Sequence, residues 1–353
     1  MAKSFSKFSR RCFLAGTAGI IASPLVLRSA AAVAKSHSVT FCAGGGSFQD
    51  NLVKYVLNPF TEETGIKVNF VPITDMAKVK AQILTGNIEW DIFDSEATTA
   101  ALGSKSGFWE KLDPSLFDLS DLVVSPASDY VIFEFFAAGV TWDPKKFGPG
   151  KHPSNFAELF DVNRFPGRRA LRNSALGTLE AALLSDGVAP KDIYPLDLDR
   201  AFKVLERIKS SVVSWTPTAA QTVSLVQTGE VDFSWTYPNR VKATTEPGGG
   251  APLAFSFEQN LLFPEALAVL KGAPNKENAM KLIGYMVRPE VQLRLENQLG
   301  LTPVSKKAAN MLSSDARKWQ PDASNPKNLV ISGEYWADHG TAVETRYKEW
   351  LLH

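Results

Sequence analysis

Residues 38–71 read SVTFCAGGGSFQDNLVKYVLNPFTEETGIKVNFV, and this stretch decides the fold. A β-rich run, Ser38–Ala43, breaks at three glycines. The apolar spacing from Phe48 to Phe60 is then that of a helix, which ends at Thr64-Gly65. The alternation from Ile66 to Val71 indicates a second strand. Strand, helix and strand at this spacing predict a parallel sheet, because parallel strands need a crossover helix.

The same alternation of strands and helices continues through the chain. A helix is expected at residues 76–84, a strand at 90–94 and an extended apolar run at 130–142. Further strands and helices are predicted, in chain order, at residues 169–171, 176–185, 198–209, 223–228, 231–235, 266–271, 276–287 and 289–299. A chain of 353 residues is too long for one simple core. We therefore expect an α/β protein of two lobes, each a mostly parallel sheet flanked by helices.

The first 34 residues have the features of an export signal and are set apart from the fold. A basic stretch that ends with Arg10-Arg11 precedes a mildly apolar run from Phe13 to Leu27, and the A-x-A pattern Ala32–Ala34 predicts cleavage near Ala34. The run Ser9–Leu14 also resembles the twin-arginine export motif, with a general secretory signal as the alternative. Both routes predict a periplasmic mature protein.

Net charge and cysteine content narrow the possible functions. The chain has 38 basic and 37 acidic residues. The first 34 residues contain five basic residues and no acidic one, so their removal leaves 33 basic and 37 acidic residues, a net charge of −4. Without a basic surplus to meet a phosphate backbone, nucleic-acid binding is not expected. Cys42 is the single cysteine of the mature part, so we expect it to be a buried apolar residue without a disulfide partner.

Several motifs of the mature chain resemble those of extracellular solute-binding proteins. The run FTEETGIKV at residues 60–68 is similar to the F-x-x-E-T-G-I-x-V pattern of that family. Other segments resemble its spermidine/putrescine-binding branch and occur in the same order: GGSFQD at 45–50, GEVD at 229–232 with Trp235, KGAPNK at 271–276, RPE at 288–290 and GLTP at 300–303. The resemblance covers nearly all of the mature chain.

The resemblance implies the two-lobe fold of type II periplasmic binding proteins, with a ligand between the lobes and a hinge of two strands. The expected boundaries are residues 35–139 and 255–303 for the first lobe, residues 140–254 and 304–353 with the C-terminal helices for the second, and strands near Ala137–Thr141 and Pro252–Phe257 for the hinge. The resemblance further implies a monomer without a cofactor, whose partners are an ABC permease and, through it, an ATPase.

In open α/β sheets, ligands bind at the carboxyl ends of the strands, where loops and helix N-termini meet. That rule selects Gly44–Phe48, Ser95–Thr98, Arg172–Ser174 and Trp235–Arg240. At the first of these places, backbone N–H groups around Gly45 and Ser47 could hold an anionic group, and Phe48 could stack on a ligand. A tight turn that needs glycine is the alternative interpretation.

The segment after the strand at 231–235 matches the family's W-N-G turn, where an aromatic residue walls the pocket. Trp235 is therefore expected to contact the ligand, with Tyr237 beside it, and the guanidinium of Arg240 could clamp a carboxylate. The alternatives are a core position for Trp235 and a solvated position for Arg240.

Two glutamates could hold a ligand ammonium. Glu265 falls where polyamine binders usually have an aspartate, and Glu96 follows a strand of the first block. Thr98 matches a family position that is often aromatic. A solvated surface carboxylate is the alternative for each glutamate.

The second lobe departs from the polyamine pattern. Polyamine binders tend to carry acids where a strand of this lobe enters its helix, but residues 171–177 hold none, and Arg172 and Ser174 stand there instead. Arg172 and Arg240 would repel a polyammonium ligand. We therefore expect a small amine or zwitterion, such as a γ-amino acid, with a polyamine still open.

Other functions have weaker sequence support. The four histidines lack the spacing of a metal site, and no G-x-S-x-G elbow is present, so neither a metal ligand nor a catalytic residue is predicted. A ferric-ion binder of the same fold would need a tyrosine cluster, and none of the seven tyrosines are adjacent. An aminophosphonate binder and an enzyme that uses the cleft are further alternatives.

Overall fold

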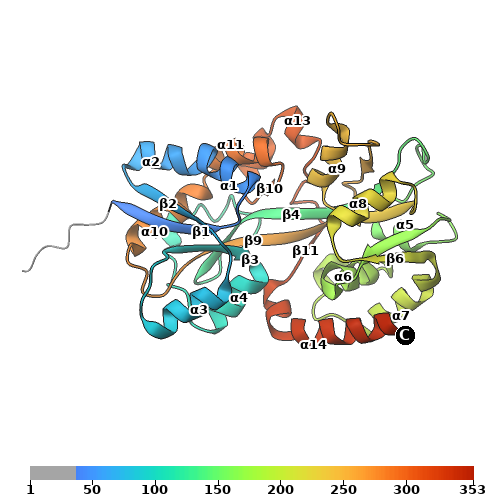
Figure 1. Ribbon diagram of the computed structural model, residues 1–353, viewed down its shortest axis with the longest axis horizontal. Helices are drawn as coiled ribbons and strands as arrows, with labels where there is room; N and C mark the ends of the chain where they lie inside the picture. The colour runs from blue at the N-terminus through green and yellow to red at the C-terminus, as the bar shows by residue number, and fades with distance from the viewer. Residues whose placement is uncertain (1–36) are drawn as a thin grey trace, which may run out of the picture. The chain divides into compact units, whose positions relative to one another are not determined.

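The computed structural model describes residues 37–353, and the predicted export signal lies outside this range. The described chain forms two α/β lobes, each built on one part of a mixed sheet (Figure 1). We call the part around the N-terminal strands the first lobe and the other the second lobe. None of the described helices is long and apolar enough to cross a bilayer.

The first lobe contains a sheet of both parallel and antiparallel strands, and helices cover this sheet. Its strands are β1 (Ser38–Ala43), β2 (Lys67–Pro72), β3 (Ile92–Glu96), β9 (Leu261–Val269), β10 (Thr302–Pro303), β11 (Leu329–Val330) and the first part of β4 (Tyr130–Trp142). Its helices are α1 (Ser47–Leu52), α2 (Asn58–Thr64), α3 (Met76–Thr85), α4 (Ala97–Lys105), α10 (Lys276–Met286), α11 (Pro289–Leu299), α12 (Lys306–Met311) and α13 (Ser314–Arg317). β1 runs parallel to β2 and β3, whereas β9 is antiparallel to β3 and β4.

The second lobe has a smaller sheet that continues from β4. Its strands are β5 (Arg169–Arg172), β6 (Val212–Thr216), β7 (Phe233–Thr236) and β8 (Ala254–Phe255), and its helices are α5 (Phe156–Phe160), α6 (Ala175–Ser185), α7 (Leu198–Ile208), α8 (Ala219–Gln227) and α9 (Pro238–Thr245). β5 is parallel to β6 and β7, and β7 is antiparallel to β4. The strand order through both lobes is β2-β1-β3-β9-β4-β7-β5-β6.

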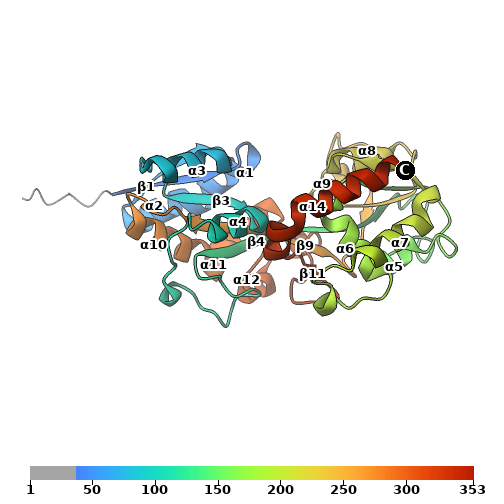
Figure 2. The ribbon, with the colours of Figure 1, turned by 90° about the horizontal axis from the view of Figure 1, so that it is seen from below.

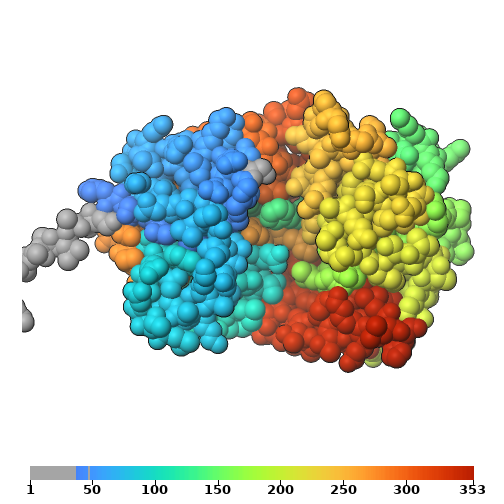
Figure 3. Space-filling model, in the orientation of Figure 1, coloured from blue at the N-terminus to red at the C-terminus, as the bar shows by residue number. Residues whose placement is uncertain are grey.

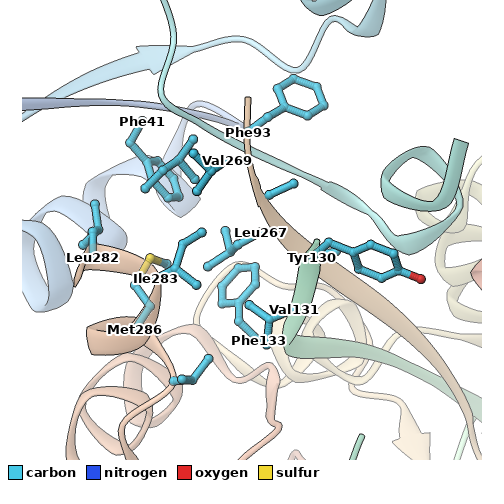
Figure 4. Close-up of a cluster of buried hydrophobic side chains, with 14 of the residues drawn as sticks. Phe41, Phe93, Tyr130, Val131, Phe133, Leu267, Val269, Leu282, Ile283 and Met286 are labelled. Atoms are coloured by element: carbon cyan, nitrogen blue, oxygen red, sulfur yellow. The ribbon is translucent and has the colours of Figure 1, made fainter. Parts of the chain in front are cut away.

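Each lobe has its own apolar core. In the first lobe, Phe133 and Leu267 from adjacent strands pack with Ile283 and Met286 of α10 (Figure 4). In the second lobe, the core contains Phe233 of β7 together with residues of α6 and α7. These two cores explain the predicted periodicity, since each helix buries one face against its sheet.

Two strands carry the chain between the cores. On β4 the core membership changes from the first to the second core between Ala137 and Ala138, and on β9 it changes between Leu262 and Leu261. Ala137 pairs with Leu262 and Ala138 with Leu261, so both strands cross side by side. This hinge differs from the expected second crossing at 252–257, because β8 pairs with Thr141 and Trp142 in the second sheet.

The helix α14 (Gly333–Leu352) runs along both lobes, packing against α4 and α6 (Figure 2). A Cβ on Gly333 would lie 2.6 Å from the backbone of Ala97, so glycine permits this close approach to α4. Trp336 and Tyr347 are buried in the second core. Val304 and Ala323, by contrast, belong to the first core. We therefore propose that the chain passes from the first lobe to the second at 137/138, returns at 261/262, and crosses to the second lobe again beyond residue 323.

Several elements differ from the sequence expectation. β9 begins at Leu261 instead of Ala266, although Pro264 lies inside it. A proline is tolerated there because β3 ends opposite Glu265, so the strand pairing on that side stops before Pro264. α4, β6 and α9 were not predicted; α4 is rich in small residues and has no strong apolar stripe to reveal it.

Candidate functional site

A cavity of about 980 Å³ opens between the two lobes, where the space-filling view is hollowed (Figure 3). It is lined by residues that follow β1 and β3 of the first lobe and β5 and β7 of the second. Helices begin directly after these strands, at Ser47, Ala97, Ala175 and Pro238. Loops and helix N-termini from both lobes therefore meet at one cavity, as expected for the carboxyl ends of strands.

The wall formed by the first lobe is acidic. Asp94, Ser95 and Glu96 line the cavity at the end of β3, and Glu265 lines it from the middle of β9. Asp94 is only 2% exposed and its Oδ1 has no hydrogen-bond partner; the buried Oγ of Ser95 has none either. Burial raises the pKa of Asp94 to about 8. Burial, together with the charges of Asp94 and Glu96, raises the pKa of Glu265 well above its usual range.

The wall formed by the second lobe is basic and aromatic. Arg172 Nη2 donates a 2.9 Å hydrogen bond to the carbonyl of Pro217, whereas its buried Nε has no partner. Burial lowers the pKa of Arg172, and the charge of Arg240 acts in the same direction. Trp235 is 2% exposed and its Nε1 also lacks a partner. Tyr237 lines the same wall, and burial raises its pKa.

A glycine at the start of α6 makes room for the aromatic part of this wall. Gly177 has φ of +82°, and a Cβ there would lie 3.0 Å from Phe263 Cζ and 3.2 Å from Trp235 Cη2. Its N–H donates to the carboxylate of Glu180 at 2.8 Å. Glu180 also accepts from Tyr194 and from Trp336 of α14. The buried Glu180 thus fixes the turn beside Trp235 to the long helix behind it.

The structure brings most of the sequence-predicted residues together. Those that line the cavity are Phe48, Glu96, Arg172, Ser174, Trp235, Tyr237, Arg240 and Glu265. Gly45 and Thr98 are not among the described lining residues, and their neighbours Gly44 and Thr99 line the cavity instead. The side chain of Ser47 lies outside the described part of the chain. That these residues contact a ligand stays a prediction.

Other lining residues were not singled out from the sequence. The sequence marks Asp94 only as the last residue of a strand, and its contact with Glu265 depends on the pairing of β3 with β9. Asn51 of α1 and Gln298 of α11 also line the cavity. Both are polar residues on amphipathic helices, and no local signal separates them from solvated positions. Among the described residues, no group of three or more His, Cys, Asp or Glu is arranged to hold a metal ion.

Comparisons with known proteins agree with this architecture. The profile of the bacterial extracellular solute-binding protein family matches residues 56–327. A gamma-aminobutyric acid-binding protein of Pseudomonas aeruginosa is 32% identical over 334 residues, which cover 91% of this chain and 93% of the relative. A spermidine/putrescine-binding periplasmic protein of Escherichia coli is 24% identical, covering 85% of this chain and 88% of the relative.

A solved structure is similar over the same extent. An ABC transporter substrate-binding protein from Bradyrhizobium japonicum superimposes with a TM-score of 0.78 and is 34% identical, covering 89% of this chain and 99% of that protein.

Proposed function

Because the chain belongs to the family of bacterial extracellular solute-binding proteins, we propose that its cleft captures a small zwitterion, such as an ω-amino acid, for an ABC importer. The ligand is bound in the periplasm by a monomer and is not transformed. The relatives that bind gamma-aminobutyric acid and polyamines by name share an amine in their ligands. An amine is therefore the part of the ligand that the family likeness favours.

One observation carries the choice of a zwitterion: buried polar atoms without partners stand on both sides of the cavity. On the first lobe, Asp94 Oδ1 is an acceptor and Ser95 Oγ can accept or donate, whereas Arg172 Nε and Trp235 Nε1, on the second, are donors. Buried polar groups are nearly always hydrogen-bonded, so a ligand that donates at one end and accepts at the other would supply partners that the described residues do not. An ammonium and a carboxylate meet both needs.

The magnitudes are compatible with useful affinity. Charge-assisted hydrogen bonds contribute about 1.5–3 kcal/mol each, and a desolvated cation–π contact contributes about 2 kcal/mol. Micromolar binding needs about 8 kcal/mol after the loss of motion is met. Two charged contacts alone are too weak, so contacts with the aromatic residues Trp235, Phe48 or Phe263, all of which line the cavity, are part of the proposal.

A polyamine fits the basic wall formed by the second lobe less well. Its distal ammonium would face Arg172 and Arg240, and like charges in a closed cleft are strongly unfavourable. The acidic first wall could still bind one amine of a polyamine. The binding experiment must therefore compare the two ligand classes.

Isothermal titration calorimetry with 4-aminobutyrate, putrescine and butyrate tests the proposal. We expect 4-aminobutyrate to bind more tightly than either of the others, since each lacks one of the two charges. Arg240→Ala should weaken 4-aminobutyrate at least tenfold and leave putrescine unchanged or improved. Arg207→Ala, on the exposed face of α7 and outside the cavity, is the matched control. Equal losses for both ligands, or recovery of a chemically altered ligand, would contradict the proposal.

A further inference from the structure

A row of acidic side chains runs from the cleft into the interior of the first lobe. Glu96 of β3 and Glu134 of β4 both lie opposite Glu265 of β9, so the three share one face of the sheet. Asp94 is two residues before Glu96 and lies on the same face. Glu296 of α11 covers the inner end of the row. Glu96 is exposed, whereas Asp94, Glu134 and Glu296 are 2%, 0% and 1% exposed.

These acids have no cation to balance them. Among the described residues, none of Asp94, Glu134, Glu265 and Glu296 forms an ion pair with a lysine, arginine or histidine. Like charges opposite each other destabilise a sheet, and an unpaired buried carboxylate is so unfavourable that it takes up a proton instead.

The acidic side chains of the row adjoin one another in two pairs. The carboxyl of Asp94 reaches that of Glu265, and the carboxyl of Glu134 reaches that of Glu296. Neither oxygen of Glu134 receives a hydrogen bond from any other described donor. Two ionised carboxylates have no donor between them, so each contact requires a proton. Burial raises the pKa of Glu134 well above its usual range, with the charge of Glu296 as the next cause, and raises the pKa of Glu296 to about 7.

The two pairs differ in what they face. The outer pair, Asp94 and Glu265, lines the cavity, where Glu96, Arg172, Tyr237 and Arg240 are the other titratable or charged groups of the lining. The inner pair, Glu134 and Glu296, is enclosed by the sheet and α11 and has no place in that lining. The inner pair nevertheless connects to the cavity, because the backbone of Leu301, a lining residue, donates a hydrogen bond to Glu296.

We propose that Asp94 and Glu265 hold a proton between them in the empty cleft, that docking of a ligand ammonium expels this proton, and that Glu134 and Glu296 are positioning residues that set how tightly it is held. The inference rests on the proposed function, since it needs a ligand with an ammonium group. The proton leaves to solvent through the cavity, the ammonium takes its place beside the carboxylate, and no covalent bond of the ligand changes.

This arrangement also serves selectivity. A neutral or anionic ligand cannot replace the proton, so it gains no ion pair with the acidic wall. The inner pair acts through charge: each negative charge it carries favours retention of the outer proton. Replacing both inner glutamates with glutamine keeps their shape and removes that charge, so the outer pair should release its proton at lower pH.

Titration calorimetry of the full mature protein with 4-aminobutyrate at pH 7, in buffers with different ionisation enthalpies, counts the protons released. We expect about one proton per ligand, and an affinity that rises about tenfold per pH unit from pH 6 to 8. The Asp94→Asn variant should release no proton when 4-aminobutyrate binds. In the double variant Glu134→Gln/Glu296→Gln, fewer protons should be released and the rise in affinity should end at lower pH. If the inner pair had a purely structural role, the double variant would change the affinity without shifting the pH at which its rise ends.

Two outcomes are separable. If 4-aminobutyrate binds with the same heat in every buffer, the inference is overturned while the proposed function stands. If neither 4-aminobutyrate nor putrescine binds, the proposed function fails and the ligand-driven step with it. Infrared spectroscopy of the ligand-free protein at pH 7 tests directly whether protonated carboxyl groups are present. The signal should weaken in the double variant, and its absence from the unsubstituted protein would overturn the inference.

Discussion

Two glutamates, Glu134 and Glu180, are both 0% exposed, yet the same substitution should affect them in opposite ways. Glu180 accepts hydrogen bonds from Tyr194 Oη at 2.7 Å, Trp336 Nε1 at 2.7 Å and the N–H of Gly177 at 2.8 Å. Glu134 accepts none from a described donor other than the neighbouring carboxyl group of Glu296. We predict that Glu180→Gln lowers the free energy of unfolding and that Glu134→Gln raises it at neutral pH.

The loss in Glu180→Gln follows from its three donors. The amide has one oxygen, which can keep Tyr194 and Trp336, while its NH₂ group then faces the N–H of Gly177. An unsatisfied buried donor costs about 1–3 kcal/mol, and the two remaining bonds lose their charge assistance. We expect a total loss of about 2–4 kcal/mol.

The gain in Glu134→Gln follows from proton linkage. Because the pKa of Glu134 is raised in the folded state, the native protein keeps a proton that the unfolded chain has lost above pH 4.5. The contribution of this proton to the free energy of unfolding is complete below pH 4.5. Above that pH the contribution falls by about 1.4 kcal/mol per pH unit. Glutamine donates to Glu296 at every pH and carries no such dependence. At pH 7 the variant should therefore gain at most about 3 kcal/mol, and near pH 4.5 almost nothing.

Urea unfolding of both variants without ligand, followed by tryptophan fluorescence at pH 5, 6, 7 and 8, measures these differences. The relative gain of Glu134→Gln should grow across that series. Destabilisation by Glu134→Gln at pH 7, or a gain that does not change with pH, would refute the protonated acid pair. A stabilising Glu180→Gln would refute the role given to its three donors.

Two further predictions concern single residues. Gly177→Ala should destabilise the fold by about 1–3 kcal/mol and weaken the binding of 4-aminobutyrate, because the new Cβ meets Phe263 and Trp235. The control Gly187→Ala, at a glycine with φ of +83° and open space around it, should introduce backbone strain alone and leave the calorimetric affinity intact. Equal affinity losses in the two variants would show that contact with Trp235 is irrelevant. Cys42 is buried and its pKa is raised to about 12, so iodoacetamide should label it only as fast as the protein unfolds in guanidinium, and rapid labelling of the folded protein at pH 8 would contradict this burial.

The place of the cleft could be predicted from the sequence because it depends on local features. Each strand end is marked by a short run of glycine or polar residues before a helix, as at Gly44–Phe48 and Trp235–Arg240. Parallel strands bring such ends to one edge of a sheet, so no long-range pairing had to be known. The helix end at Gly65, with φ of +71°, was readable for the same reason.

The acidic row could not be predicted in this way, because it depends on strand register and on a distant helix. Asp94 meets Glu265 only through the pairing of β3 with β9, which are 165 or more residues apart in the chain. One signal was available: Glu134 is the single charged residue in the apolar strand 130–142. A lone acid in a strand buried on both faces needs a partner or a proton, although the sequence does not say which. Nothing local distinguishes Glu296 on its amphipathic helix.

The unpartnered atoms on the two walls also bear on how the lobes close. Asp94 Oδ1, Ser95 Oγ, Arg172 Nε and Trp235 Nε1 are already shielded from water, and in an empty cleft no described group compensates them. Each buried polar atom left unsatisfied costs about 1–3 kcal/mol, so an empty cleft that keeps all four atoms buried is disfavoured by several kcal/mol. A ligand with charges of both signs removes this penalty only in the closed form, which is the differential affinity that a population shift requires. A ligand with one charge relieves one wall alone. Closure, and with it delivery to a permease, should therefore distinguish 4-aminobutyrate from butyrate more sharply than binding to an open lobe would.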